Sequence, residues 1–136
     1  MSTYLLFFGF SWMVVAALIG LVQGVRHARV TARLDALAHS KDVEAYHREV
    51  TQFRGNIVVH AHAFLFSVVC IASALTLGHA ALPAPVPSVL AAVFAAATVT
   101  WTAAALLRSR PLMGLADVAF LLGLVTMVIG LGRALE

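Results

Sequence analysis

The chain has 136 residues, of which 62% are hydrophobic and only 11% are charged, and its formal net charge is +3. A water-soluble domain carries about 25% charged residues, so the composition excludes a domain that faces water on all sides. The length fits one compact unit. A single cysteine, Cys70, excludes an intrachain disulfide. The composition therefore indicates a small integral membrane protein made of one domain, residues 1–136.

Four apolar runs follow one another along the chain, at residues 4–25, 56–77, 86–107 and 112–131. Each has about 20 residues, the length of helix that crosses a hydrocarbon core of ~30 Å. The runs lack the alternating pattern of a barrel strand, so they predict helices. The first run lacks a basic start and a small-residue cleavage site, and we interpret it as a span rather than a signal peptide.

The segment 26–54, between the first two runs, contains charged residues with apolar residues at helical spacing. The apolar positions are Val30, Leu34 and Leu37, then Val43, Tyr46, Val50 and Phe53. Ser40 is the expected N-cap between the two patterns, with Asp42 and Glu44 following in the first turn. We expect helices one and two to extend beyond the membrane as a cytoplasmic hairpin. The alternative is a pair of helices that lie on the anionic leaflet.

The remaining links are short. "GHAALPAPVP" joins runs two and three and is rich in proline, which stops a helix. "RSRP" joins runs three and four, and Pro111 fits the first turn of the last helix. Short links between consecutive helices favour an all-α, up-down-up-down four-helix bundle.

The basic residues predict the orientation of the bundle. Eight of the nine lie in the first and third links: Arg26, Arg29, Arg33, Lys41, Arg48, Arg54, Arg108 and Arg110. Only Arg133 lies at the opposite end. The positive-inside rule therefore predicts cytoplasmic links and both termini outside, in a bacterial-type inner (plasma) membrane. Anionic lipid headgroups explain the basic segment, which lacks the interleaved aromatics of a nucleic-acid reader.

Small residues recur along two spans. Ala16, Gly20 and Gly24 are spaced by four in the first, and the third is dense in alanine. Such surfaces let helix backbones approach closely inside lipid. They predict packing within the bundle, or alternatively the contact face of a homo-oligomer.

Three ionisable residues lie inside the apolar runs: His60, His62 and Asp117. Counted from the cytoplasmic end, all three have a similar depth, and Trp101 comes to the same level. Intramembrane ionisable residues usually face a bundle interior or a cavity. We therefore expect the two imidazoles and the carboxylate to meet across the bundle, with Trp101 as a packing neighbour.

The spacing of the histidines limits their chemistry. Two positions on an α-helix correspond to a rotation of about 200°, so the two rings point to nearly opposite faces and cannot both bind one metal without a local distortion of the helix. One ring is expected to point into the bundle as a ligand. His27 or His47 could complete a metal site, and Asp117 could act as a ligand or orient an imidazole. The candidate metal ligands are thus His60, His62, Asp117 and His27. No second histidine at matching depth in helices three or four supports a bis-histidine haem.

The stretch "VVHAHAFLFSVV", with "HREVTQFRGN" before it, resembles short four-helix membrane proteins related to subunit I of haem-copper (cytochrome c) oxidases. In the large oxidases a histidine of an early span ligates haem b, so the resemblance implies His60 or His62 as a haem ligand. Ser67 stands where that family usually has glycine, and the long first link is unusual for it. A weaker likeness to the membrane glutathione-transferase-type family fails, because "RGNIVVH" lacks that family's acidic residue.

These features support three functional hypotheses. The first is a protein that binds haem b or a transition metal through His60 and His62, in electron transfer or as an accessory of a respiratory complex. The second is a non-catalytic membrane subunit or scaffold, in which the histidines and Asp117 only tie helices together. The third is a small oligomeric transporter that depends on Asp117. The expected partners are the lipid bilayer and either a homo-oligomer or a respiratory complex. The sequence has no phosphate loop, Gly-x-Ser-x-Gly or CxxC motif. Whether the chain is an enzyme, for example a redox component of a respiratory complex, therefore stays open.

Overall fold

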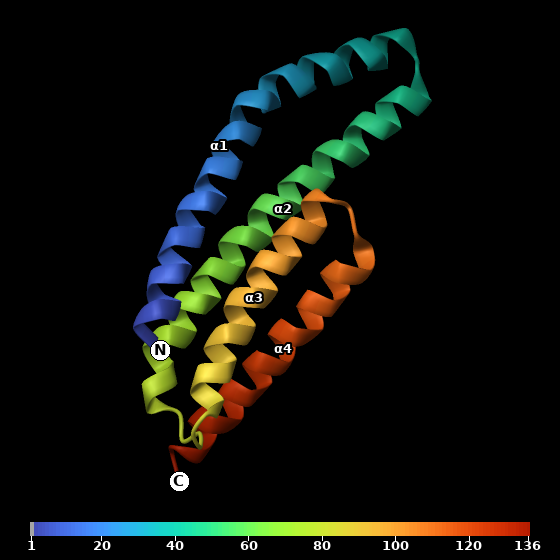
Figure 1. Ribbon diagram of the computed structural model, residues 1–136. Coiled ribbons are helices and arrows are strands. Elements are labelled where there is room, and N and C mark those ends of the chain that lie inside the picture. The colour runs from blue at the N-terminus through green and yellow to red at the C-terminus, as the bar shows by residue number, and fades with distance from the viewer. Residues whose placement is uncertain (1) are drawn as a thin grey trace.

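The computed structural model describes residues 2–136, which form an up-down-up-down arrangement of four α-helices (Figure 1). The helices are α1 (Ser2–Ser40), α2 (Val43–Thr76), α3 (Val86–Leu106) and α4 (Arg110–Arg133), and a short 3-10 helix, η1 (Leu77–His79), follows α2. No strand occurs among the described residues. The all-α prediction is therefore confirmed.

All four helices are long and apolar enough to cross a membrane. Each predicted span lies inside one of them, apart from two end residues: Leu77 belongs to η1, and Leu107 caps α3. Pro111 lies in the first turn of α4, as expected. These dimensions fit a multi-pass membrane protein.

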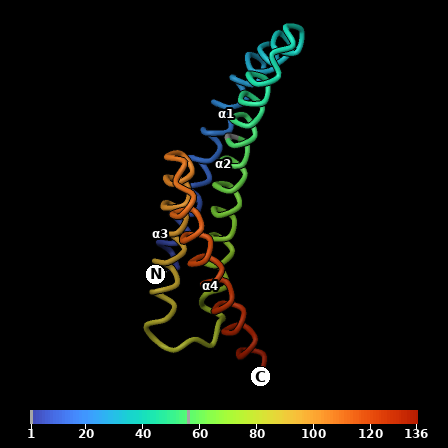
Figure 2. Tube along the Cα trace, turned by 90° about the vertical axis from the view of Figure 1, so that its right-hand side faces the viewer, coloured from blue at the N-terminus to red at the C-terminus, as the bar shows by residue number. Residues whose placement is uncertain are grey.

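The first two helices are much longer than the last two. With a rise of 1.5 Å per residue, the 39 residues of α1 and the 34 of α2 measure about 58 and 51 Å, against about 32 Å for the 21 residues of α3. The paired ends of α1 and α2 project past the α3–α4 turn in both views (Figure 1 and Figure 2). The predicted helical hairpin is thus present, and we call its projecting part, residues 26–54, the hairpin. Both termini and the α2–α3 link lie at the opposite end.

The turn of the hairpin corrects one expectation. Ser40 is not the N-cap of α2; it is the last residue of α1, and its hydroxyl donates to the Leu37 carbonyl oxygen at 2.9 Å. Asp42 caps α2 instead, since its carboxylate accepts a hydrogen bond from the Ala45 amide at 3.0 Å. A carboxylate at a helix N-terminus also interacts favourably with the helix dipole. Lys41 makes the turn with a φ of 60°.

The core gathers around α3. Its buried residues recur every three or four positions: Leu90, Ala91, Phe94, Ala97, Thr98, Trp101, Thr102 and Ala104. The Phe94 ring packs so closely on Gly123 of α4 that an added Cβ there would lie 2.8 Å from a ring carbon. By contrast, α1 buries only three of its described residues, Leu5, Gly9 and Ala16. Most of the apolar surface of α1 is therefore exposed, so it is available to lipid or to another protein.

Candidate functional site

His60 belongs to the interface between α1 and α2. Its Nδ1–H donates a hydrogen bond of 2.9 Å to the carbonyl oxygen of Ala16, and its ring is half-buried. The ring occupies the space that a side chain at Gly20 would need, because an added Cβ would lie 2.5 Å from Cε1 of His60. Glycine at position 20 thus makes room for the imidazole. The small residue here accommodates a side chain of α2, whereas the sequence predicted that it would let two helix backbones approach closely.

His62 belongs to a different interface, between α2 and α3. Its ring stacks on the indole of Trp101, with centroids 4.4 Å apart and planes inclined by 7°. Phe66 packs edge-on against the same indole, with centroids 5.6 Å apart, and its ring lies tilted by 34° against that of Phe120 of α4, with centroids 4.3 Å apart. His62 is therefore one end of an aromatic cluster that joins α2, α3 and α4. The expectation that Trp101 packs beside the histidines is confirmed for His62.

The two imidazoles share one chemical property. His62 donates its Nδ1–H to the Val58 carbonyl oxygen at 3.0 Å, as His60 does to that of Ala16. A carbonyl oxygen can only accept, so Nδ1 carries the proton in both rings. In this tautomer Nε2 carries the lone pair with which a histidine binds a metal.

Asp117 does not meet the histidines, contrary to the expectation from depth. Its side chain is exposed on α4, and within residues 2–136 it makes no hydrogen bond or ion pair. Its neighbour Ala116 faces the core, so the carboxylate lies on the outward side of the helix. Depth follows from counting residues along a helix, whereas this outward rotation of α4 does not.

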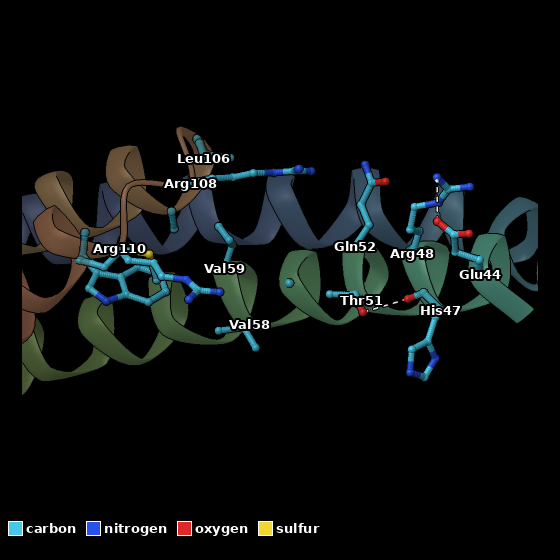
Figure 3. A pocket seen from close by; sticks show the side chains of 14 residues that line it. Glu44, His47, Arg48, Thr51, Gln52, Val58, Val59, Leu106, Arg108 and Arg110 are labelled. Atoms are coloured by element: carbon cyan, nitrogen blue, oxygen red, sulfur yellow. Dashed lines mark hydrogen bonds and ion pairs between the residues drawn. The ribbon is translucent and has the colours of Figure 1, made fainter.

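His27 and His47 also lie apart from the span-two pair. The ring of His27 packs on Phe53 of α2, with centroids 5.3 Å apart, in the hairpin. His27 is 11 residues beyond Ala16 on α1, or about 16 Å along the helix axis. His47 is exposed, and its ring points away from the other labelled side chains in Figure 3.

The four candidate metal ligands, His60, His62, Asp117 and His27, are therefore distributed over separate surfaces. Within residues 2–136, no group of three or more histidine, cysteine or acidic side chains is placed to hold a metal ion. Because the histidines lie on separate surfaces, each could supply only a single imidazole ligand to a haem or metal. The arrangement does not fit a bis-histidine haem within one chain. Ligation by either histidine stays a prediction.

A cavity of about 880 Å³ lies between the hairpin stretch of α2 and the α3–α4 turn (Figure 3). It is lined by arginines at its polar side, namely Arg48, Arg108 and Arg110, and by Trp101, Val59 and Met113 at its apolar side. We call it the arginine pocket. From the sequence alone, these arginines predict only the orientation of the bundle. That Arg108 and Arg110 flank one tight turn was the signal that could have drawn attention to them.

Comparisons of this chain with protein-family models, with curated proteins and with solved structures found no match.

Proposed function

We propose that the chain is a non-catalytic subunit of a larger membrane complex, and that it joins the complex through the outward face of α4. The observation that carries the proposal is the carboxyl group of Asp117, which is exposed within an apolar helix and has no partner in the described residues. In a protein without a partner, this carboxyl group would face lipid, which costs free energy. In a docked subunit, the partner can supply a polar or basic side chain that offsets this cost.

The depth of Asp117 makes its exposure costly. It lies seven residues into α4 from Arg110, or about 10 Å along the axis, which is beyond the headgroup level if Arg110 lies there. An aspartate at the centre of a spanning helix costs about 3 kcal/mol on insertion scales, and nearer the interface it costs less. A partner helix with a basic side chain at the same depth would remove this cost. Charge complementarity therefore favours a partner of different sequence over a second copy, whose own carboxylate would repel.

The surroundings of Asp117 fit such a contact. The exposed large apolar residues on the same helix are Leu112, Leu115, Val118, Leu121, Leu122, Val125, Val128 and Ile129. Gly114, one turn before Asp117, has open space around it, so a second helix can approach the backbone there. The histidines support the non-catalytic assignment, because both are used in packing within the chain.

Photo-crosslinking in native membranes tests this proposal. A photoreactive residue at Val118, which is exposed and adjacent to Asp117, should yield one main adduct with a polypeptide that has Lys, Arg or His inside an apolar span. Asp117→Asn should lower the adduct yield about five- to thirtyfold, which corresponds to the loss of about 1–2 kcal/mol of intramembrane polar interaction.

Asp35→Asn, in the hairpin, is the matched control and should leave the yield unchanged. An equal yield from Asp117→Asn would overturn the proposal, and so would a self-adduct that does not depend on Asp117. A probe at Val14 on the exposed face of α1 should not capture the same polypeptide.

Ligation of haem b or a transition metal is a second candidate, and one observation favours it. Both histidines have Nδ1–H fixed on a carbonyl oxygen, which leaves Nε2 available as a ligand. In that case one imidazole would hold the group at the edge of the bundle, and a partner subunit would supply any second axial ligand. A Soret band or stoichiometric metal in the purified complex, lost in His60→Ala or His62→Ala, would support this function; a colourless, metal-free complex would contradict it.

A further inference from the structure

The arginine pocket combines a cationic mouth with an apolar floor. Three arginines line it against one acidic residue, Glu44. Arg48 and Glu44 form an ion pair of 3.8 Å whose side chains are both largely exposed, so water screens it strongly. Within residues 2–136, Arg108 and Arg110 have no ion-pair partner. The pocket therefore has positive charge that the protein does not neutralise.

The α3–α4 turn holds the first of these arginines in an unusual conformation. The Ser109 amide donates to the Ala104 carbonyl oxygen at 2.8 Å and the Arg108 amide to that of Ala105 at 3.2 Å, as in a Schellman motif. Arg108 occupies the position where glycine is usual, with a φ of 57°. Its side chain extends from the turn along α2 toward Gln52 (Figure 3). The turn thus keeps a guanidinium where glycine would form the motif with less strain.

The apolar part of the pocket is suited to hydrocarbon. Val58 and Leu106 line it and are 43% and 65% exposed, and Met113 of α4 adds a flexible apolar side chain. Trp101 also lines the pocket but is only 2% exposed. A small soluble anion would use the arginines but would leave the exposed apolar side chains uncovered.

We propose that the arginine pocket binds one anionic phospholipid of the surrounding leaflet. The anionic headgroup lies in the mouth that Arg108, Arg110 and Arg48 line, and an acyl chain covers Val58, Leu106 and Met113. Guanidinium groups pair with phosphate oxygens in a bidentate manner. A zwitterionic headgroup binds less well, because its own cation offsets the negative charge of its phosphate. The proposal depends on membrane embedding but is independent of a partner at Asp117.

Fluorescence of Trp101 reports this binding directly. The chain has two tryptophans, so Trp12→Phe leaves Trp101 as the only reporter. The full-length Trp12→Phe protein, in zwitterionic detergent, is titrated with phosphatidylglycerol or phosphatidylcholine that carries bromine on its acyl chains. We expect saturable quenching with one phosphatidylglycerol per chain, at about tenfold or more lower concentration than with phosphatidylcholine.

Charge variants then test the arginines. Arg108→Gln with Arg110→Gln should weaken phosphatidylglycerol binding about tenfold or more. Lys41→Gln is the matched control, because Lys41 is also a basic residue with positive φ at a helix end but lies outside the pocket; it should have no effect. Arg108→Lys with Arg110→Lys, which keeps the charge, checks that the turn still folds and should retain most of the binding.

Three results would overturn the proposal. The first is equal quenching by both lipids. The second is unchanged phosphatidylglycerol binding in the double glutamine variant. The third is competition by glycerol phosphate at the concentration of phosphatidylglycerol itself, which would assign the pocket to a soluble anion. Failure of these tests leaves the α4 proposal intact, since the crosslinking experiment does not involve the pocket.

Discussion

His60 and His62 are two residues apart on α2, yet they contact opposite kinds of surface. His60 lies against the backbone of α1, where Ala16 offers a carbonyl oxygen and Gly20 offers space. His62 lies against the flat face of Trp101 on α3. The first interface depends on small residues and one interhelical hydrogen bond, and the second depends on ring stacking.

The comparison shows how a membrane helix can accommodate polar side chains by packing them against neighbouring helices. In lipid, association of helices depends on packing and hydrogen bonds, because the surrounding hydrocarbon removes the hydrophobic drive. A histidine supplies both, since its ring packs and its N–H donates. α2 is consequently the helix that joins α1, which buries few of its residues, to the core formed with α3 and α4. Several substitutions, with unequal expected effects, would test this difference.

Trp101→Ala should be the most damaging of them. It removes the indole against which both His62 and Phe66 pack, and the side chain is only 2% exposed. Large-to-small core substitutions of this kind cost about 3 kcal/mol or more. Unfolding of the purified protein in mixed micelles of mild detergent and sodium dodecyl sulfate measures the loss. Trp12→Ala, at a half-buried position on α1, should cost less than half as much, and equal losses would contradict the difference between the interfaces.

Gly20→Ala should rank second. Its new Cβ would lie 2.5 Å from the His60 ring, so the imidazole must move and its bond to Ala16 must lengthen or break. Overpacking of this kind costs about 1–3 kcal/mol. The same unfolding assay applies, and Gly24→Ala provides the control, since nothing lies near that position. Gly24→Ala should be neutral or stabilising by up to about 1 kcal/mol; a comparable loss at both positions would disprove the role given to Gly20.

The histidines themselves should give the smallest effects. His60→Ala removes one interhelical hydrogen bond, which is worth about 1 kcal/mol. His62→Phe keeps an aromatic ring for the stack on Trp101 and removes only a bond within α2, so it should cost about 0.5 kcal/mol or less. Micelle unfolding of the two variants side by side measures the order. If His62→Phe were the more damaging, the polar atoms of His62 would matter beyond stacking.

The sequence predicts the number, length and order of the helices well, because length in lipid and the proline-rich links constrain them strongly. It also predicts that His60 and His62 point to different sides of α2, which follows from helix geometry and agrees with their contacts to α1 and α3. The N-cap was assigned to Ser40 instead of Asp42, because both are good capping residues and only the hydrogen bonds distinguish them.

The rotation of α4 could not be derived in the same way. Apolar residues surround that helix on every side, so no polar stripe indicates which face is inward. Asp117 was placed at the right distance from the helix end but on the wrong side. The arginine pocket was missed for a related reason, since it depends on how the α3–α4 turn lies against α2, which is a contact between segments far apart in the sequence.

The greater length of α1 and α2, compared with α3 and α4, has a mechanical consequence. α1 continues from the bundle into the projecting hairpin without a proline or a break, and exceeds α3 by about 27 Å. A projection of that length moves further than the bundle when the molecule reorients: a tilt of 5° in the bilayer moves the tip sideways by about 2 Å. The turn at Lys41 is therefore displaced by tilts that leave the short α3–α4 turn almost stationary.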